Sequence, residues 1–371
     1  MSKTKITGYS QTHLGNNMTK TTRVMLAVLA ACGASAAMAQ SSVNLYGRVN
    51  TSIEHQKLGN ASATGMVTNS SFIGFRGTED LGNGLKAGFV LEANFNSDDG
   101  AGSDNGAFNF KRNSEINLAG GFGMLRLGSF YPASYLATAD YISMHNHDTG
   151  TSADYLYFGA ASNGNVIAYR TPDIAGFNAE VQYRLGEKAS IDAGTWEDKG
   201  GWDLGVNYAN GPLGLGFGYS QQKRDVLPAG VTAGEANEKD SQFALRASYA
   251  IGDLTLGAYY QKQKSDFANV KAKRDAYRLA AMYVIGASEL HANVGRATKV
   301  KIDGVKTGES ATQWTLAYNY NLSKRTKVYA LYTNINNTAS AEVASPAAFN
   351  LNNTANSDKF RAYGVGIRHL F

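Results

Sequence analysis

The sequence predicts an all-β protein, an antiparallel transmembrane β-barrel of sixteen strands. From Val43 onward the chain repeats segments of about ten residues of alternating polarity, separated by turns of Gly, Asn, Pro and Asp. The chain contains 41 Gly, 21 Tyr and 16 Phe but only 5 Pro, without the Gly-X-Y period of collagen, which favours strands and turns. In each segment, the face opposite the apolar one carries charges and glycines, which are not expected in a packed core.

The first element, residues 1–39, is predicted to be a secretory signal peptide. Lys20 and Arg23 precede an apolar run over 24–39, and Ala37-Met38-Ala39 gives an A-x-A cleavage pattern. A start at Met18 would give a leader of ordinary length, so whether residues 1–17 are translated stays open. No other apolar run is long enough for a membrane-spanning helix. Residues 40–371 are predicted to form a single barrel domain.

The leader also holds the only cysteine, Cys32, so disulfides are not expected in the mature chain. Residues 29–32 also resemble a lipobox, and the alternative is a mature protein lipidated on Cys32. Of 35 Lys and Arg, four lie in the leader, which leaves 31 bases against 30 acids. The mature chain is thus almost neutral, and no nucleic-acid partner is predicted.

Sixteen alternating segments follow in order. They span 43–55, 68–79, 84–96, 109–119, 123–130, 164–172, 176–187, 200–209, 212–224, 239–250, 252–265, 274–285, 287–300, 309–320, 324–336 and 358–371. Short turns at 80–84, 120–123, 210–212, 251–252, 286–287 and 321–323 mostly alternate with longer loops. Alternation alone also fits a soluble β-sandwich, but one end with short turns and one with long loops is typical of outer-membrane barrels.

The polar faces predict a water-filled interior. Seven basic residues fall on these faces: Arg48, Arg76, Lys86, Arg170, Arg184, Arg246 and Arg278. An arginine facing lipid at mid-depth costs about 2–4 kcal/mol, so these side chains are expected to point inward. Aromatic residues near strand ends, including Tyr208, Tyr249, Tyr260 and Trp314, fit the girdles at the membrane interfaces.

The last segment ends the chain inside a strand. Its apolar face is formed by Tyr363, Val365, Ile367, His369 and Phe371. Such a strand needs a partner on both edges, which closure of a barrel supplies.

Three motifs in order resemble the Gram-negative general porins of the β-proteobacterial type, across nearly the whole mature chain. These are SSVNLYGR at 41–48, GFRGTEDLGNGL at 74–85 and GIRHLF at 366–371. The resemblance implies a trimeric, sixteen-stranded barrel in the outer membrane, with its third loop folded inward and a C-terminal strand that carries the assembly signal. The longest internal connection, 131–163, occupies the place of that loop.

In the family, acids on this loop face basic residues on the wall and create the pore constriction. The candidate acids are Asp140, Asp148 and Asp154. The matching wall positions are Arg48, Arg112 and Arg170, although the alternation around Glu115 leaves open which face Arg112 occupies.

The fit to the family is incomplete. Phe72 stands where an arginine is common, Ser129-Phe130 replaces Arg-Gln, and the loop lacks the usual Pro-Glu-Phe-Gly tip. Arg126, Arg76 and Lys86 are therefore added to the candidate basic residues of the constriction.

Other motifs are weaker. His145 and His147 lack further ligands nearby, so no metal site is predicted. The Gly-Leu-Gly-Phe-Gly segment at 214–218 lies within an alternating strand, where small residues leave room in the lumen, and opens no helix as a nucleotide-binding motif would. No hydrolase or P-loop motif is present, so neither a cofactor nor catalysis is expected.

The sequence thus predicts a passive diffusion channel for small hydrophilic solutes and ions, with modest anion preference because the basic candidates outnumber the acidic ones. The expected partners are two further copies of the chain, outer-membrane lipids with lipopolysaccharide, and the barrel assembly machinery. Two alternatives stay open: an outer-membrane enzyme on a smaller barrel, and a secreted or lipidated β-sandwich adhesin.

Overall fold

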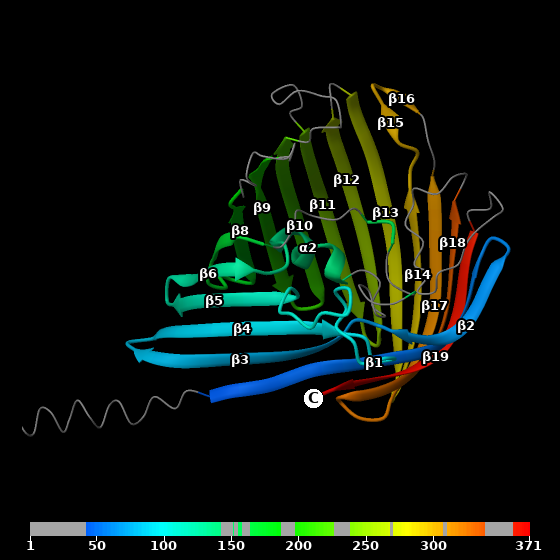
Figure 1. The fold of residues 1–371 in the computed structure, drawn as a ribbon, viewed down its shortest axis with the longest axis horizontal. Coiled ribbons are helices and arrows are strands. Elements are labelled where there is room, and N and C mark those ends of the chain that lie inside the picture. The colour runs from blue at the N-terminus through cyan, green and yellow to red at the C-terminus, as the bar shows by residue number, and fades with distance from the viewer. Residues whose placement is uncertain are drawn as a thin grey trace, which may run out of the picture. The chain divides into compact units, whose positions relative to one another are not determined.

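The computed structural model describes residues 42–141, 151, 155–157, 164–186, 197–225, 238–267, 270–306, 310–337 and 359–371. In this part of the chain sixteen antiparallel strands form a closed ring (Figure 1). They are β1 (Ser42–Leu58), β3 (Ser71–Gly82), β4 (Leu85–Phe95), β5 (Asn113–Gly120), β6 (Gly123–Ser129), β7 (Val166–Arg170), β8 (Phe177–Arg184), β9 (Glu197–Asn210), β10 (Leu213–Asp225), β11 (Glu238–Ile251), β12 (Leu254–Phe267), β13 (Val270–Ile285), β14 (Ser288–Ala297), β17 (Ala311–Asn321), β18 (Thr326–Asn337) and β19 (Lys359–Leu370). The sixteen-strand prediction is confirmed.

The ring closes between the first and last strands. β19 pairs with β18 on one edge and with β1 on the other, where the register runs from Arg48 opposite Leu370 to Leu58 opposite Phe360. The backbones of Phe371 and Gly47 exchange two further hydrogen bonds, with N–O distances of 3.1 and 3.2 Å. Closure thereby leaves neither terminal strand with a free edge.

The two faces of the wall are inverted relative to a soluble protein. On β1, Asn50, Glu54 and Gln56 point inward and are fully buried, while Leu45 and Ile53 point outward and are both 56% exposed. A wall that exposes its apolar residues and buries its polar ones is suited to lipid outside and a polar interior. No helix among the described residues is long and apolar enough to cross a membrane.

The connection between the first two predicted segments, 56–67, is predicted to be a loop but is mostly sheet. β1 continues to Leu58, and after a two-residue turn β2 (Ala61–Thr68) pairs back onto it. Between β2 and β3 one extra residue forms a bulge at Asn69 and Ser70, where Ser70 has a φ of 56°. Small residues and Gly65 weaken the alternation of 61–68, so this strand is hard to predict from residue order.

A second addition lies in the connection after β14. There β15 (Lys301–Ile302) and β16 (Val305–Lys306) form a small hairpin that pairs with the long-loop end of β13. The hairpin extends the sheet beyond the end of β14, beside the upper part of β13 (Figure 1).

Candidate pore constriction

The connection after β6 enters the barrel and begins with a short helix, α2 (Ala133–Ala137), followed by the 3-10 turn η1 (Ala139–Tyr141). α2 lies against β9 and β10 inside the ring (Figure 1). The helix approaches so closely because three inward-facing positions are glycine. A Cβ on Gly216 would lie 1.9 Å from the carbonyl oxygen of Ala137, and one on Gly205 would lie 2.3 Å from that of Ala133. Gly218 likewise faces Ser134.

The glycines at 214–218 therefore have a more specific role than the sequence suggested. Gly216 and Gly218 do not leave open lumen; the space is filled by α2. The sequence pattern could show that these positions were small, but only the packed loop shows what occupies the space.

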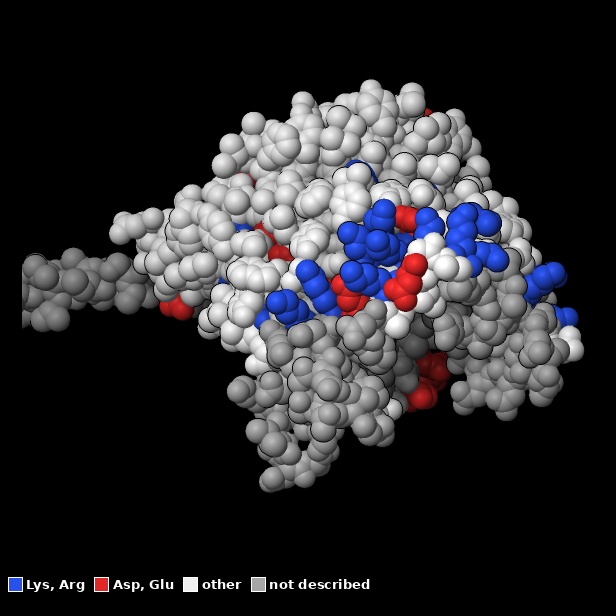
Figure 2. Space-filling view, turned by 90° about the horizontal axis from the view of Figure 1, so that it is seen from above, with Lys and Arg blue, Asp and Glu red and all other residues white. Residues whose placement is uncertain are grey.

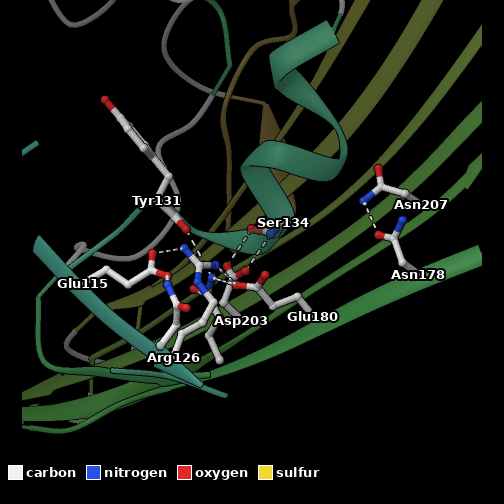
Figure 3. Close-up of polar contacts among 10 residues, drawn as sticks. Glu115, Arg126, Tyr131, Ser134, Asn178, Glu180, Asp203 and Asn207 are labelled. Atoms are coloured by element: carbon white, nitrogen blue, oxygen red, sulfur yellow. Dashed lines mark hydrogen bonds and ion pairs between the residues drawn. The ribbon is translucent and has the colours of Figure 1, made fainter. Parts of the chain in front are cut away.

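Asp203 of β9 fixes the start of this helix. Its carboxylate accepts hydrogen bonds from the backbone N–H and the hydroxyl of Ser134, at 2.6 and 2.5 Å (Figure 3). The first N–H groups of a helix have no partner within the helix, so a buried carboxylate here satisfies one of them. The hydroxyl of Thr138 donates to the carbonyl of Ser134, at 2.6 Å.

Later described residues of the same connection contact the opposite wall. Thr151 donates a hydrogen bond to Glu54 of β1 at 2.6 Å, and the N–H of Tyr155 donates one to Gln313 of β17 at 3.0 Å. Leu156 packs against Ala297 and Ala311. The connection thus bridges the lumen from the β9–β10 wall to the walls of β1, β14 and β17.

Arg126 of β6 lies in a buried ion triad. Its guanidinium bonds to Glu115 of β5 and Glu180 of β8, both at 2.6 Å (Figure 3). It also lies 4.0 Å from the ring centre of Phe130. Gln182 bonds both to Glu180 and to the carbonyl of Tyr131, where the inward connection begins. Two carboxylates flank this arginine, so its charge is largely neutralised within the wall.

A second cluster surrounds Phe72, the residue that departs from the family pattern. The guanidinium of Arg112 lies 4.3 Å and that of Arg48 5.5 Å from its ring centre. Arg112 forms an ion pair with Glu92 at 3.0 Å and donates to the hydroxyl of Tyr131 at 3.1 Å. An aromatic ring thus lies between two cations, where its π face attracts both.

The cluster answers the question that the sequence left open about Arg112. Arg112 lies one residue before β5, not within a strand as predicted, and it points into the barrel. Arg48 bonds to the carbonyl of Ser70 at 2.9 and 3.1 Å, so the unpredicted bulge holds the first candidate arginine.

The remaining basic candidates fall into two groups. Arg184, Arg246 and Arg278 are buried; Arg278, 2% exposed, bonds to Asn293 and Gln313 at 2.5 and 3.0 Å. Arg76, Lys86 and Arg170 share the inward face but are exposed, and all lie toward the short-turn end. The sequence placed all six on the inward face and counted only Arg76, Lys86 and Arg170 as constriction candidates; burial separates the same two groups.

The predicted loop acids are only partly described. Asp140 lies half-buried in η1, whereas Asp148, Asp154, His145 and His147 lie outside the described residues. Sequence reasoning missed the wall acids Glu92, Glu115 and Glu180. Parity could have identified two of them, because Glu92 alternates in step with Lys86 and Glu180 with Arg184, whereas the alternation around Glu115 left its face open. Within the described ranges no group of three or more His, Cys, Asp or Glu is placed to hold a metal ion.

Both the sequence and the fold match known proteins. The family model of the Gram-negative porins matches residues 26–340. The chain belongs to this family. The outer membrane porin protein 32 of Delftia acidovorans is 37% identical, over 95% of this chain and all of that protein. An outer membrane porin protein of Bordetella pertussis is 28% identical, over 94% of this chain and 99% of that protein.

Among solved structures, an anion-selective porin from Comamonas acidovorans superposes with a TM-score of 0.75 at 30% identity, covering 90% of this chain and all of that one. The trimer form of OmpT from Vibrio cholerae, at 19% identity and a TM-score of 0.65 over 89% of this chain and 99% of its own, shares the fold. This porin is accordingly an integral barrel of the outer membrane of a Gram-negative bacterium. In barrels of this kind the short turns face the periplasm.

Proposed function

We propose that this porin is a passive diffusion channel for small hydrophilic solutes and ions, selective by size and by a modest preference for anions. The narrow passage lies between the connection 131–163 and the wall that carries Arg48 and Arg112. Asp140, Asp148 and Asp154 are the proposed acids on the loop side.

The observation that carries the anion preference is that some inward arginines are neutralised by carboxylates of the wall and others are not. Arg112 and Arg126 are each paired with wall carboxylates. Arg76 and Arg170 are exposed on the inward face, and within the described residues neither forms an ion pair. Glu180, opposite Arg170, is already bound by Arg126. The wall around Arg76 and Arg170 therefore keeps a positive field, which attracts anions and which salt screens. The anion selectivity of the Comamonas relative supports the same conclusion.

The test is the reversal potential of the refolded protein in a planar bilayer under a KCl gradient. We expect an anion-selective potential, reduced in the double variant Arg76→Ala/Arg170→Ala. Arg296→Ala is the matched control, because Arg296 points outward and bonds to Thr312 at 3.1 Å. Cation selectivity of the unmodified protein would refute the proposal, and an equal change in the control would remove Arg76 and Arg170 from the selective region.

We further propose that the barrel works as a homotrimer, assembled by the barrel assembly machinery in a membrane that contains lipopolysaccharide. The proposed assembly signal is the outward face of β19 at Tyr363, Val365, Ile367 and His369, with Phe371. Conductance steps in threes would support the trimer, whereas single independent steps would contradict it.

Residues 1–39 are proposed to be removed on export, leaving 40–371 as one barrel domain, and mass spectrometry of the mature N-terminus distinguishes this from lipidation at Cys32. We propose no catalytic activity, since the family consists of channels. A closed sixteen-strand ring also differs from the two stacked sheets expected of an adhesin.

A further inference from the structure

Four lysines lie side by side on the outer face at the long-loop end. Lys264 of β12 pairs with Lys273 of β13, Lys273 with Lys301 of β15, and Lys301 with Lys306 of β16. All four are exposed. Alternation places Lys264 on the same outward face as Tyr260, and Lys273 on that of Tyr277. We call these four residues the lysine row.

The lysine row has an unfavourable arrangement of charge. Like charges directly opposite each other on neighbouring strands are destabilising. Among the described residues none of the four forms an ion pair. The nearest outward acids are engaged elsewhere: Asp275 accepts from Tyr260 at 2.7 Å and lies 4.0 Å from Lys262, and Asp303 accepts from the N–H of Lys271 at 3.0 Å.

Among the described residues Asp266 is the remaining acid on this outward face, and it lies one row farther out. It is opposite Lys239 on β11 and Lys271 on β13, so two further lysines balance it. Figure 2 shows Lys and Arg gathered in one part of the molecular surface, with a few Asp and Glu among them, beside a broad area without charge. An anionic partner outside the chain would remove the repulsion within the lysine row.

An apolar surface lies directly below the lysine row. Phe243, Tyr260 and Tyr277 form a continuous aromatic band, with ring centres 5.8 and 5.2 Å apart. Beneath Phe243 and Tyr260 a groove runs from β12 across to β8, and its part nearest the lysine row is lined by Leu215, Phe217, Leu245, Ala247, Ala258 and Tyr260. Ala247 and Ala258 are direct neighbours across the strands, and their small side chains make the floor. From Lys264 to Ala258 along β12 is about 20 Å.

We propose that the lysine row and this groove form one binding site for a phosphorylated glycolipid of the outer leaflet, of the lipid A class. The phosphate groups lie against the lysine row, and one acyl chain lies in the groove. The order along the wall, with cations above, aromatic rings at the interface and a groove in the apolar band, matches the order of headgroup and chain in such a lipid. The site rests on the proposed function, because it requires a porin in a membrane that contains lipopolysaccharide, with its long loops on the outer side as is general for such barrels.

The test uses the full mature porin refolded in detergent and titrated with three probes. These are diphosphoryl lipid A, the same lipid without its phosphates, and inorganic phosphate. We expect tight binding of the first and weak binding of the other two, because phosphates and chains act together. If the lipid binds equally well with and without its phosphates, the phosphate contact is overturned. If inorganic phosphate binds as tightly as diphosphoryl lipid A, the groove contributes nothing and the site is overturned.

Two charge variants locate the site. Lys264→Gln/Lys273→Gln should weaken lipid A binding by about tenfold or more, given what each lysine near a lipid surface contributes. The matched control, Lys324→Gln/Arg325→Gln, removes two exposed charges at the short-turn end and should bind as the unmodified protein does. Equal affinity of the two variants would overturn the assignment. Ala258→Phe, which fills the groove floor, should weaken binding of the acylated probes only.

Two further measurements separate this inference from the rest. Without lipid, Lys264→Gln/Lys273→Gln should raise the unfolding temperature, because repulsion is relieved; a lowered temperature would contradict the charge argument. All variants are also assayed for conductance. Normal channels without site-specific lipid binding would refute the lipid site alone, and absence of channels in every preparation would refute the proposed function.

Discussion

The two walls beside the inward connection hold it in opposite ways. The β9–β10 wall lacks side chains at the contact: Gly205 and Gly216 let the backbone of α2 come close, and Asp203 binds its first turn. The wall of β4 to β8 presents large charged side chains, with Arg112 and Arg126 bound to carboxylates around the start of the connection.

The two walls therefore determine different properties: one determines the position of α2, and the other determines the charge that acts on permeating ions. Contacts with glycine set how far α2 stands from the wall, and hence the width of the passage. The arginine clusters set which charges remain to act on permeating ions. Changes on the glycine wall should therefore alter conductance, whereas changes on the charged wall should alter selectivity or stability.

The largest effect is expected from breaking the ion triad. Arg126→Met leaves Glu115 and Glu180 buried near each other without their cation, and removing one member of a buried pair costs about 3–5 kcal/mol. The measurement is the unfolding free energy in denaturant. The triple variant Arg126→Met/Glu115→Gln/Glu180→Gln should recover much of the loss, and failure to recover any would show that the cost is not electrostatic.

The next effect tests the glycine wall. Gly216→Ala puts a methyl group 1.9 Å from a backbone oxygen of α2, so the helix must shift, at a cost of about 1–3 kcal/mol. Single-channel conductance should change while ion selectivity changes little. Gly214→Ala is the control on the same strand, since its methyl group meets only the hydroxyl of Ser248 at close range. The same conductance for both variants would contradict the role given to Gly216.

A smaller effect tests the charged wall. Glu92→Gln keeps an acceptor for Tyr46, which bonds to it at 2.7 Å, but removes the charge that neutralises Arg112. The anion-to-cation permeability ratio should rise by about twofold, equivalent to about 0.4 kcal/mol, with conductance nearly unchanged. Reversal potentials at low salt measure it. A fall in the ratio would show that Glu92 does not offset Arg112.

The smallest effect concerns the aromatic ring between two cations. Phe72→Leu removes the π face beside Arg48 and Arg112 and should cost about 0.5–1 kcal/mol of stability for each contact. Phe72→Tyr keeps the ring and is the control. If the Phe72→Leu and Phe72→Tyr variants have equal unfolding free energies, the ring stabilises the cluster only by filling space.

Much of the wall could be predicted from residue order alone. The period of two in segments such as 200–209 and 239–250 determines which side chains share a face, and the turns at Gly252 and Gly286, both with φ of 58°, are marked by glycine. The β1–β2 hairpin and the bulge at Ser70 were missed, because small residues alternate weakly and a bulge depends on the partner strand.

The site was less predictable. The inward arginines were found, because parity assigns them to the polar face. That Arg278 is buried while Arg170 is exposed depends on what covers each one. The loop that covers the wall comes from a distant part of the chain.

The sequence by itself determined the strands, their inward and outward faces and the membership of the porin family, because these depend on local period and on motifs. Only the tertiary structure decided how far the inward connection stands from the wall, which arginines are neutralised by Glu92, Glu115 and Glu180, and which lysines meet in one row. Those properties are distances between strands far apart in the chain, set by register and closure of the ring, and no local pattern encodes them.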